Sequence, residues 1–403
     1  MRLRLAAATA FLLCAASAHA QTLRPEVGKP LAAARAAAAA HNFAKANAAL
    51  RQAEAAGGKT PAENMKIAQM RAYIAQQSGD SADAARAYEQ LLNSGALPPG
   101  ETAAVMKDEI GFAYAQKNYP EVVKWAERYL KINPSDTAIR TTLIQGYYLQ
   151  GNYAQAEKLQ LQQIALETRG GRAPAEDQLQ LLYSCQSHLN DKAGQATTIR
   201  QLIYYFPNSP HRSDYWLNAI DTLRTTPGFS DRLMLDVYRL EWSLGLVNKA
   251  SDAMEYAELA LQAKLGGEAK DVVDKSFASG LMGTGADAPR QDRLRKLVDA
   301  TYASEKAALG KEDADAATDR DGNRLCALGE TYVSFGDTGQ GISLLEQGLR
   351  KDQLRHADDE KLHLAYAYVL AGQKSKAIAT LKTVGGNEGT SALATLWLIH
   401  IGR

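Results

Sequence analysis

Apolar residues recur at helical spacing along almost the whole chain, and no run shows the strict alternation expected of a β-strand. Alanine is abundant, and Gly, Asn or Asp interrupts the pattern about every fifteen to twenty residues. This pattern predicts an all-α chain of about nine or ten antiparallel helical hairpins. Outside the repeat described next, helices are expected over residues 31–40, 43–55, 62–77, 82–92, 103–116, 120–132, 137–149, 153–164, 178–189, 194–205, 213–223, 232–244, 251–263, 268–279, 292–309 and 390–401.

The clearest periodicity lies between Leu325 and Leu381, where one pattern of residues occurs twice. Four pairs of like residues stand 36 positions apart: Leu328 and Leu364, Tyr332 and Tyr368, Gly336 and Gly372, Leu345 and Leu381. Two earlier hairpins repeat at a spacing of 33, between Ile110 and Leu143 and between Tyr114 and Tyr147. A fixed spacing of this size predicts stacked helical repeats.

These motifs resemble the tetratricopeptide repeat (TPR) family. Its unit carries a leucine and a small residue in the first helix, an aromatic three residues later, a Gly-Asp or Gly-Asn turn, an alanine in the second helix and a closing proline. Here Gly329, Tyr332 and Gly336-Asp337 match one copy, and Pro134 closes another. The resemblance implies an all-α, TPR-like α-solenoid of the kind exported by bacteria.

In TPR proteins the first helix of each hairpin lines a groove that takes a peptide or a partner helix. Transferred to this sequence, the resemblance nominates eight groove residues: Phe112, Gln116, Gln145, Tyr148, Glu330, Ser334, Tyr366 and Leu370. Tyr148 and Tyr366 could instead serve only packing between repeats. A lysine–asparagine clamp for a terminal carboxylate is not expected, because Thr141 and Gln145 hold its places. A second candidate surface is an aromatic group of Tyr204, Tyr205, Phe206, Tyr215 and Trp216.

The N-terminal stretch has the order of a secretory signal. Arg2 and Arg4 precede an apolar run over residues 5–16, and Ala18-His19-Ala20 forms a small-x-small cleavage site. Cleavage after Ala20 is predicted, so the mature protein is expected in the periplasm or outside the cell. The run is too short for a membrane anchor. Lipidation at Cys14 is disfavoured because bulky leucines precede it.

Charge argues against nucleic acid or an anionic membrane as a partner. After cleavage 44 basic residues face 45 acidic ones. No later apolar run reaches 18 residues, so no integral membrane segment is expected. Cys185 and Cys326 lie several repeats apart, and we expect two separate, mostly buried thiols.

The sequence offers only loose matches to the motifs of cofactor, metal and catalytic sites. Gly283-Thr-Gly285-Ala-Asp-Ala288 fits a loose dinucleotide pattern, but no predicted strand precedes it. A calcium loop beginning at Asp319 would need glycine where Arg324 stands. No histidines form a recognised ligand pair, and no nucleophile elbow or P-loop is present. The sequence therefore predicts no cofactor, no metal site and no enzymatic activity.

Three segments should follow the signal at 1–20: an N-terminal solenoid over 21–280, a loop, helix and acidic linker over 281–324, and a C-terminal repeat pair with a capping helix over 325–403. The expected function is a periplasmic scaffold that binds a peptide or protein partner, in a cell-envelope transport, energy-transduction or secretion complex. The alternative is a TPR-scaffolded envelope enzyme or chaperone with a site near residues 280–323. Self-association of the solenoid ends is a third reading.

Overall fold

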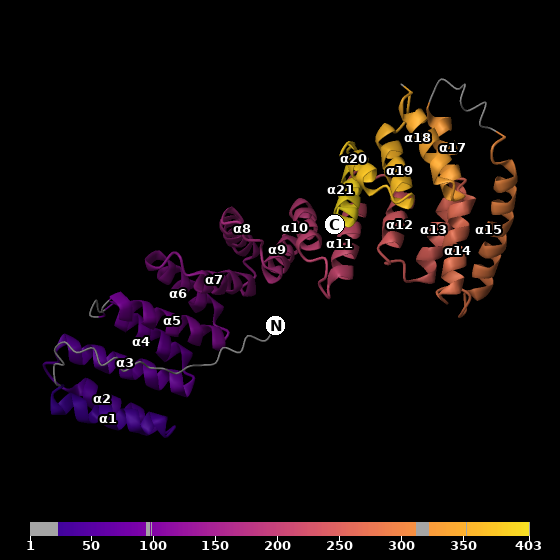
Figure 1. The fold of residues 1–403 in the computed structure, drawn as a ribbon. Coiled ribbons are helices and arrows are strands. Elements are labelled where there is room, and N and C mark those ends of the chain that lie inside the picture. The colour runs from indigo at the N-terminus through magenta and orange to yellow at the C-terminus, as the bar shows by residue number, and fades with distance from the viewer. Residues whose placement is uncertain (1–22, 94–96, 98, 312–321, 352, 403) are drawn as a thin grey trace. The chain divides into compact units, whose positions relative to one another are not determined.

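The computed structural model describes residues 23–93, 97, 99–311, 322–351 and 353–402 (Figure 1). Within these ranges the regular structure is helical, and successive helices pack as antiparallel pairs. The predicted all-α, TPR-like solenoid is confirmed. The predicted signal segment at 1–20, with Cys14, lies outside the described residues, as do Asp319 and Asp321.

Packing divides the chain into two compact units, Met1–Gln162 and Gln163–Arg403, which we call the first and second units. The first unit is built from regular pairs, with α8 crossing its boundary. Its helices are α1 (Pro25–Ala39), α2 (Phe43–Ala55), α3 (Pro61–Ser78), α4 (Ser81–Asn93), α5 (Pro99–Ala115), α6 (Tyr119–Ile132), α7 (Thr137–Leu149) and α8 (Tyr153–Arg169).

Polar residues at helix ends join neighbouring repeats of the first unit. Asp136 caps α7 by accepting a hydrogen bond from the Ile139 amide at 3.1 Å. The same carboxylate accepts one from the Tyr129 hydroxyl at 2.8 Å and pairs with Lys107 Nζ at 2.8 Å. One side chain at the start of α7 therefore binds α5 and α6 as well, which fixes how the two hairpins stack.

The other helices of the described residues belong to the second unit. These are α9 (Glu176–His188), α10 (Lys192–Tyr205), α11 (Arg212–Arg224), the short 3-10 helix η1 (Asp231–Leu233), α12 (Met234–Ser243), α13 (Ala250–Gln262), α14 (Gly266–Ala278), α15 (Ala288–Ala308), α17 (Asn323–Ser334), α18 (Thr338–Leu349), α19 (Ala357–Leu370), α20 (Lys374–Leu381) and α21 (Thr390–Ile401).

Glycine explains the close packing of α17 against α18, the first copy of the repeat found between Leu325 and Leu381. A Cβ atom on Gly329 would lie 2.8 Å from the Gly341 carbonyl oxygen, and one on Gly341 would lie 2.5 Å from Val333 Cγ2. The turn between the helices uses Gly336 at a φ of 89°, a conformation that glycine adopts without strain. Both features follow from the small and Gly-Asp positions of the repeat.

The C-terminal helices pack back onto the beginning of the second unit. One hydrophobic core joins residues of α9–α12, among them Trp216 and Leu240, to Leu362 of α19 and Leu393 and Trp397 of α21. A polar contact repeats the connection, because Arg232 Nε donates to Asp359 Oδ2 at 2.6 Å. The predicted cap at residues 390–401 therefore covers both the final repeat and a segment about 180 residues earlier.

The segment boundaries expected at 280 and 324 fall inside the second unit. They stay predictions about which pieces fold independently. Cys185 and Cys326 are both buried in this unit, and neither is part of a disulfide. Among the residues that the structure describes, no helix combines the length and the apolar character needed to cross a bilayer.

Candidate functional site

The second unit contains a cavity of about 640 Å³, lined by side chains of α12, α14, α15, α17, α18 and α19. Four of the eight residues nominated from the repeat register line it: Glu330, Ser334, Tyr366 and Leu370. The two repeat copies therefore direct their first helices, α17 and α19, to the same cavity. The structure brings this half of the predicted set together.

Helical periodicity places the charged side chains beside this cavity. Residues three apart share a helix face, so Asp236 and Arg239 project together from α12, and Glu360 and His363 from α19. Glu330 reaches them from α17. Three helices, α12, α17 and α19, thus present charged groups to one another.

Arg239 is the centre of the network, with a side chain that is 3 % exposed. Its Nε and Nη2 donate to the two carboxylate oxygens of Glu268 at 2.9 and 2.8 Å, a bidentate pair. Nη1 donates to Asp236 Oδ1 at 2.8 Å. The guanidinium carbon also lies 4.9 Å from the ring centre of Tyr366. Tyr366 therefore packs against a buried cation and lines the cavity at the same time.

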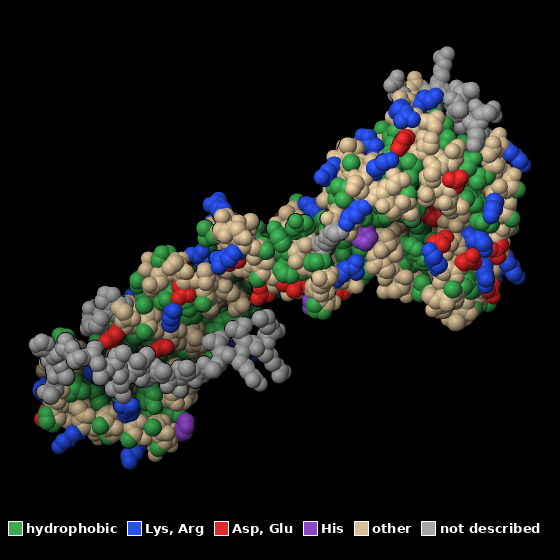
Figure 2. Space-filling model, viewed as in Figure 1, with side chains coloured by type: hydrophobic (Ala, Val, Ile, Leu, Met, Phe, Trp, Pro, Cys, Tyr) green, Lys and Arg blue, Asp and Glu red, His purple; other side chains and the backbone are tan. Residues whose placement is uncertain are grey.

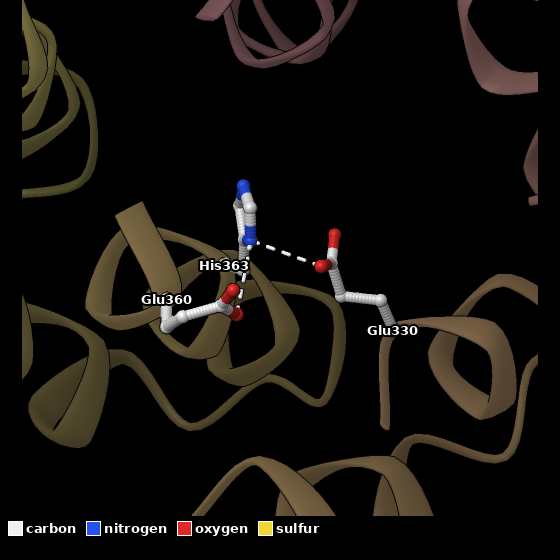
Figure 3. Close-up of side chains that lie close together, drawn as sticks. All are labelled: Glu330, Glu360 and His363. Atoms are coloured by element: carbon white, nitrogen blue, oxygen red, sulfur yellow. Dashed lines mark ion pairs between the residues drawn. The ribbon is translucent and has the colours of Figure 1, made fainter. Parts of the chain in front are cut away.

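His363 connects the network to two further carboxylates, those of Glu330 and Glu360, which Figure 3 shows. Its Nε2 lies 3.2 Å from Asp236 Oδ2. Its Nδ1 lies 3.0 Å from Glu330 Oε1 and 3.5 Å from Glu360 Oε2. One imidazole therefore meets three carboxylates carried by α12, α17 and α19.

The charged forms of these groups stabilise one another. Burial opposes ionisation of Asp236, but attraction to His363 and Arg239 outweighs burial and lowers the pKa of this carboxyl to about 2. The pKa of Glu330 is lowered in the same way, chiefly by His363 against the effect of burial. Burial would lower the pKa of His363, but the fields of Glu330 and Asp236 raise it well above its ordinary value.

The lining of the cavity also includes charged side chains and the apolar side chain of Leu370. Lys270 Nζ pairs with Asp299 at 2.8 Å, and Lys275 with Asp271 at 2.7 Å. Figure 2 shows acidic and basic side chains gathered over α14 and α15. Leu370 lines the same cavity and is 51 % exposed. The cavity therefore combines an exposed apolar side chain with charged groups.

The other four nominated residues lie in the first unit. Phe112 is only 8 % exposed and packs in the hydrophobic core. Gln145 Oε1 accepts from the Tyr114 hydroxyl at 3.3 Å, and the rings of Tyr148 and Tyr153 meet edge to face at 5.4 Å. Gln116 is exposed. For Phe112, the structure shows packing where a groove position was expected.

The second candidate surface, the aromatic group at residues 204–216, also contains both exposed and buried side chains. Tyr204 is 59 % exposed, whereas Tyr215 and Trp216 are core residues, the latter against His400.

The dinucleotide-like loop follows α14, and its Gly283 amide donates to Gln291 Oε1 of α15 at 2.6 Å. Among the described residues no strand precedes this loop.

Sequence reasoning missed Arg239, Asp236 and His363. The local signal was the spacing of Glu360 and His363, one helical turn apart, which also fits an ordinary solvated helix face. Only the stacking of α12, α14, α17 and α19 distinguishes these readings.

A scan against protein-family models and a search of curated proteins each gave no match. Solved structures with some similarity include Naa15/Naa10 bound to HypK-THB, at TM-score 0.36 and 17% identity over 92% of this chain and 63% of that one. Apo RapI gives 0.32 and 12% over 68% and 86% of the two chains, and Cut9–Hcn1 of APC/C gives 0.23 and 14% over 93% and 90%. The chain spans less than two thirds of the Naa15/Naa10 chain it matches. Because these TM-scores are low, the fold is assigned from the helices of this chain alone.

Proposed function

We propose that this protein is a non-enzymatic scaffold that binds a peptide or protein partner in the cavity of the second unit. The observation that carries the proposal is the meeting of Glu330, Ser334, Tyr366 and Leu370 around one cavity. These residues were nominated from repeat register alone, and they come from two successive repeats. In stacked-helix proteins, the first helices of successive repeats together form an extended binding surface.

The cavity also has the composition of a recognition surface. Tyr366 is held in place by Arg239, so it is ordered before a partner arrives. Leu370 supplies exposed apolar area, and Lys270 and Lys275, each in an ion pair, supply polar groups to the lining of the same cavity. A central anchor with a polar rim is the usual arrangement of protein interfaces. A peptide with an apolar side chain flanked by charged residues fits this arrangement.

The setting that we propose is the periplasm, within a cell-envelope transport, energy-transduction or secretion complex. Support comes from the signal-like order of residues 1–20 and from the near balance of acidic and basic residues. Fusion of residues 1–20 to a reporter that is active only after export tests the location. An inactive reporter would refute export.

Partner capture tests the binding site. The full chain is used to capture proteins from a cell-envelope extract, alongside Leu370→Ala and Leu166→Ala. Leu370 and Leu166 are 51 % and 54 % exposed, so the two substitutions remove similar apolar area, but Leu166 does not line the cavity. We expect Leu370→Ala to reduce recovery of the partner about tenfold and Leu166→Ala to leave it unchanged. Equal recovery with both variants would overturn the assignment.

A further inference from the structure

We propose that Glu330, Glu360 and His363 form a binding site for a divalent transition-metal cation, with Zn²⁺ as the best fit. Each residue offers one ligand atom, and the three atoms lie within 4.8 Å of one another. Two carboxylates come from α17 and α19 and the imidazole from α19 (Figure 3). One nitrogen and two oxygens are donors that Zn²⁺ accepts, and three protein ligands leave one position open.

The spacing of the donor atoms suits an ion between them. A tetrahedral zinc ion with bonds of about 2.0–2.2 Å separates its ligands by about 3.3–3.6 Å. Nδ1 of His363 lies 3.0 Å from Glu330 Oε1 and 3.5 Å from Glu360 Oε2. Small side-chain rotations would therefore bring all three atoms to coordination distance.

Two of these atoms are also left without a hydrogen bond. His363 Nδ1 and Glu360 Oε2 are buried, and their ion-pair contacts at 3.0 and 3.5 Å are not aligned as hydrogen bonds. Buried polar atoms are normally satisfied, so an exception calls for an explanation. A cation bound to both atoms provides one, with the Nδ1 proton released to solvent.

The surroundings of His363 match those of a metal-binding imidazole. A ligating histidine commonly directs its other ring nitrogen to a carboxylate, which fixes the orientation of the ring. His363 Nε2 lies 3.2 Å from Asp236 Oδ2, and Asp236 is itself held by Arg239 at 2.8 Å. The imidazole is thus positioned from behind by a buried ion pair, which leaves Nδ1 facing the two glutamates.

Charge and access favour the same conclusion. The network contains four carboxylates, on Asp236, Glu268, Glu330 and Glu360, and two basic side chains, on Arg239 and His363. A divalent cation offsets this excess of negative charge. Glu330 and His363 also line the cavity, so an ion can enter from solvent and its open position can face a bound partner.

Zinc binding by the full chain tests the proposal. The purified chain is treated with a chelator, dialysed against Zn²⁺ and assayed for bound metal, with Co²⁺ as a spectroscopic probe of low coordination number. Glu360→Gln keeps the shape of the side chain and removes one anionic donor. Glu346→Gln, a matched change on α18 outside the cluster, is the control.

We expect about one zinc ion per chain, intense visible cobalt bands, and affinity at least about tenfold weaker in Glu360→Gln than in Glu346→Gln. Glu330→Gln gives an independent reading if Glu360→Gln fails to fold. Absence of bound zinc in the folded native chain would overturn the proposal, as would equal affinity in a folded ligand variant and the control.

Discussion

The two units place their buried charge differently. In the first unit the carboxylates that join helices, such as Asp136, sit at helix ends where amides and lysines satisfy them. Glu109 is the contrast within that unit, because it is 1 % exposed and its Oε2 has no hydrogen-bond partner. In the second unit Arg239 satisfies Asp236 and Glu268 together, deep between helices.

The difference separates two ways of specifying a repeat stack. Caps at helix ends fix the stacking of neighbouring hairpins and require no ion network between the helices. A central ion network requires particular helices to meet, because each charge is costly without its partner. The second unit therefore gains a defined polar cavity, and the first unit remains a regular stack.

The largest effect is expected from Arg239→Met. Removal of the cation takes away the bidentate partner of buried Glu268 and leaves Asp236 with His363 as its basic partner, so the second unit should lose about 3–5 kcal/mol. Amide hydrogen exchange should rise in α12, α14, α17 and α19 and stay unchanged in α1–α6. Arg355→Met, at an exposed position, is the control. Unchanged exchange in α14 would show that the network does not hold the unit together.

The C-terminal helices of the second unit pack back onto its first helices, an arrangement that we call closure. Leu393→Ala tests it. Leu393 is fully buried in the core that joins α21 to α9–α12, so its truncation should cost about 2–5 kcal/mol. Faster exchange is expected in α10 and α11 as well as in α19 and α21. The matched change Leu50→Ala in α2 should affect only the first unit. Faster exchange confined to α19–α21 would contradict closure.

In the first unit, Glu109→Gln should stabilise the protein at alkaline pH. Burial, with a smaller contribution from Glu121, raises the pKa of Glu109 to about 8. Because an unfolded glutamate ionises near pH 4.5, the native carboxyl costs nothing below that pH and increasingly more as pH rises to 8. Removal of the charge should add about 1–3 kcal/mol at pH 8 and little at pH 4.5. A thermal-unfolding difference that is the same at both values would refute this assignment.

The smallest effect is expected from Asp136→Ala. Loss of a helix cap should cost about 1 kcal/mol at pH 7. Hydrogen bonding from Lys107 lowers the pKa of Asp136 to about 2, so its contribution is present above pH 3.8 and is lost as pH falls towards 2. The variant and the native chain should therefore converge in acid denaturation. A difference that persists at pH 2 would assign the effect to packing.

Much of the fold could be predicted because local signals mark the helix ends. The expected helices at 137–149 and 390–401 agree with α7 and α21, each set by turn residues next to a helical pattern. Closure of the second unit could not be predicted, since the contact of Arg232 with Asp359 depends on the accumulated rotation of all the intervening repeats. The cluster at His363 was missed for the same reason. The position of Glu330 within the repeat predicted that it faces a groove. Its partner His363, however, lies on another helix, which comes near only when the repeats stack.

We assign partner binding to the cavity of the second unit. The direct test places a photo-cross-linking residue at position 370 or at position 116, an exposed groove position nominated in the first unit. Each full-length protein is irradiated in envelope extract, and the products are compared. We expect a discrete cross-linked partner from position 370 that is lost on addition of unlabelled native chain, and none from position 116. A competed product from position 116 alone, or none from position 370, would refute binding in this cavity.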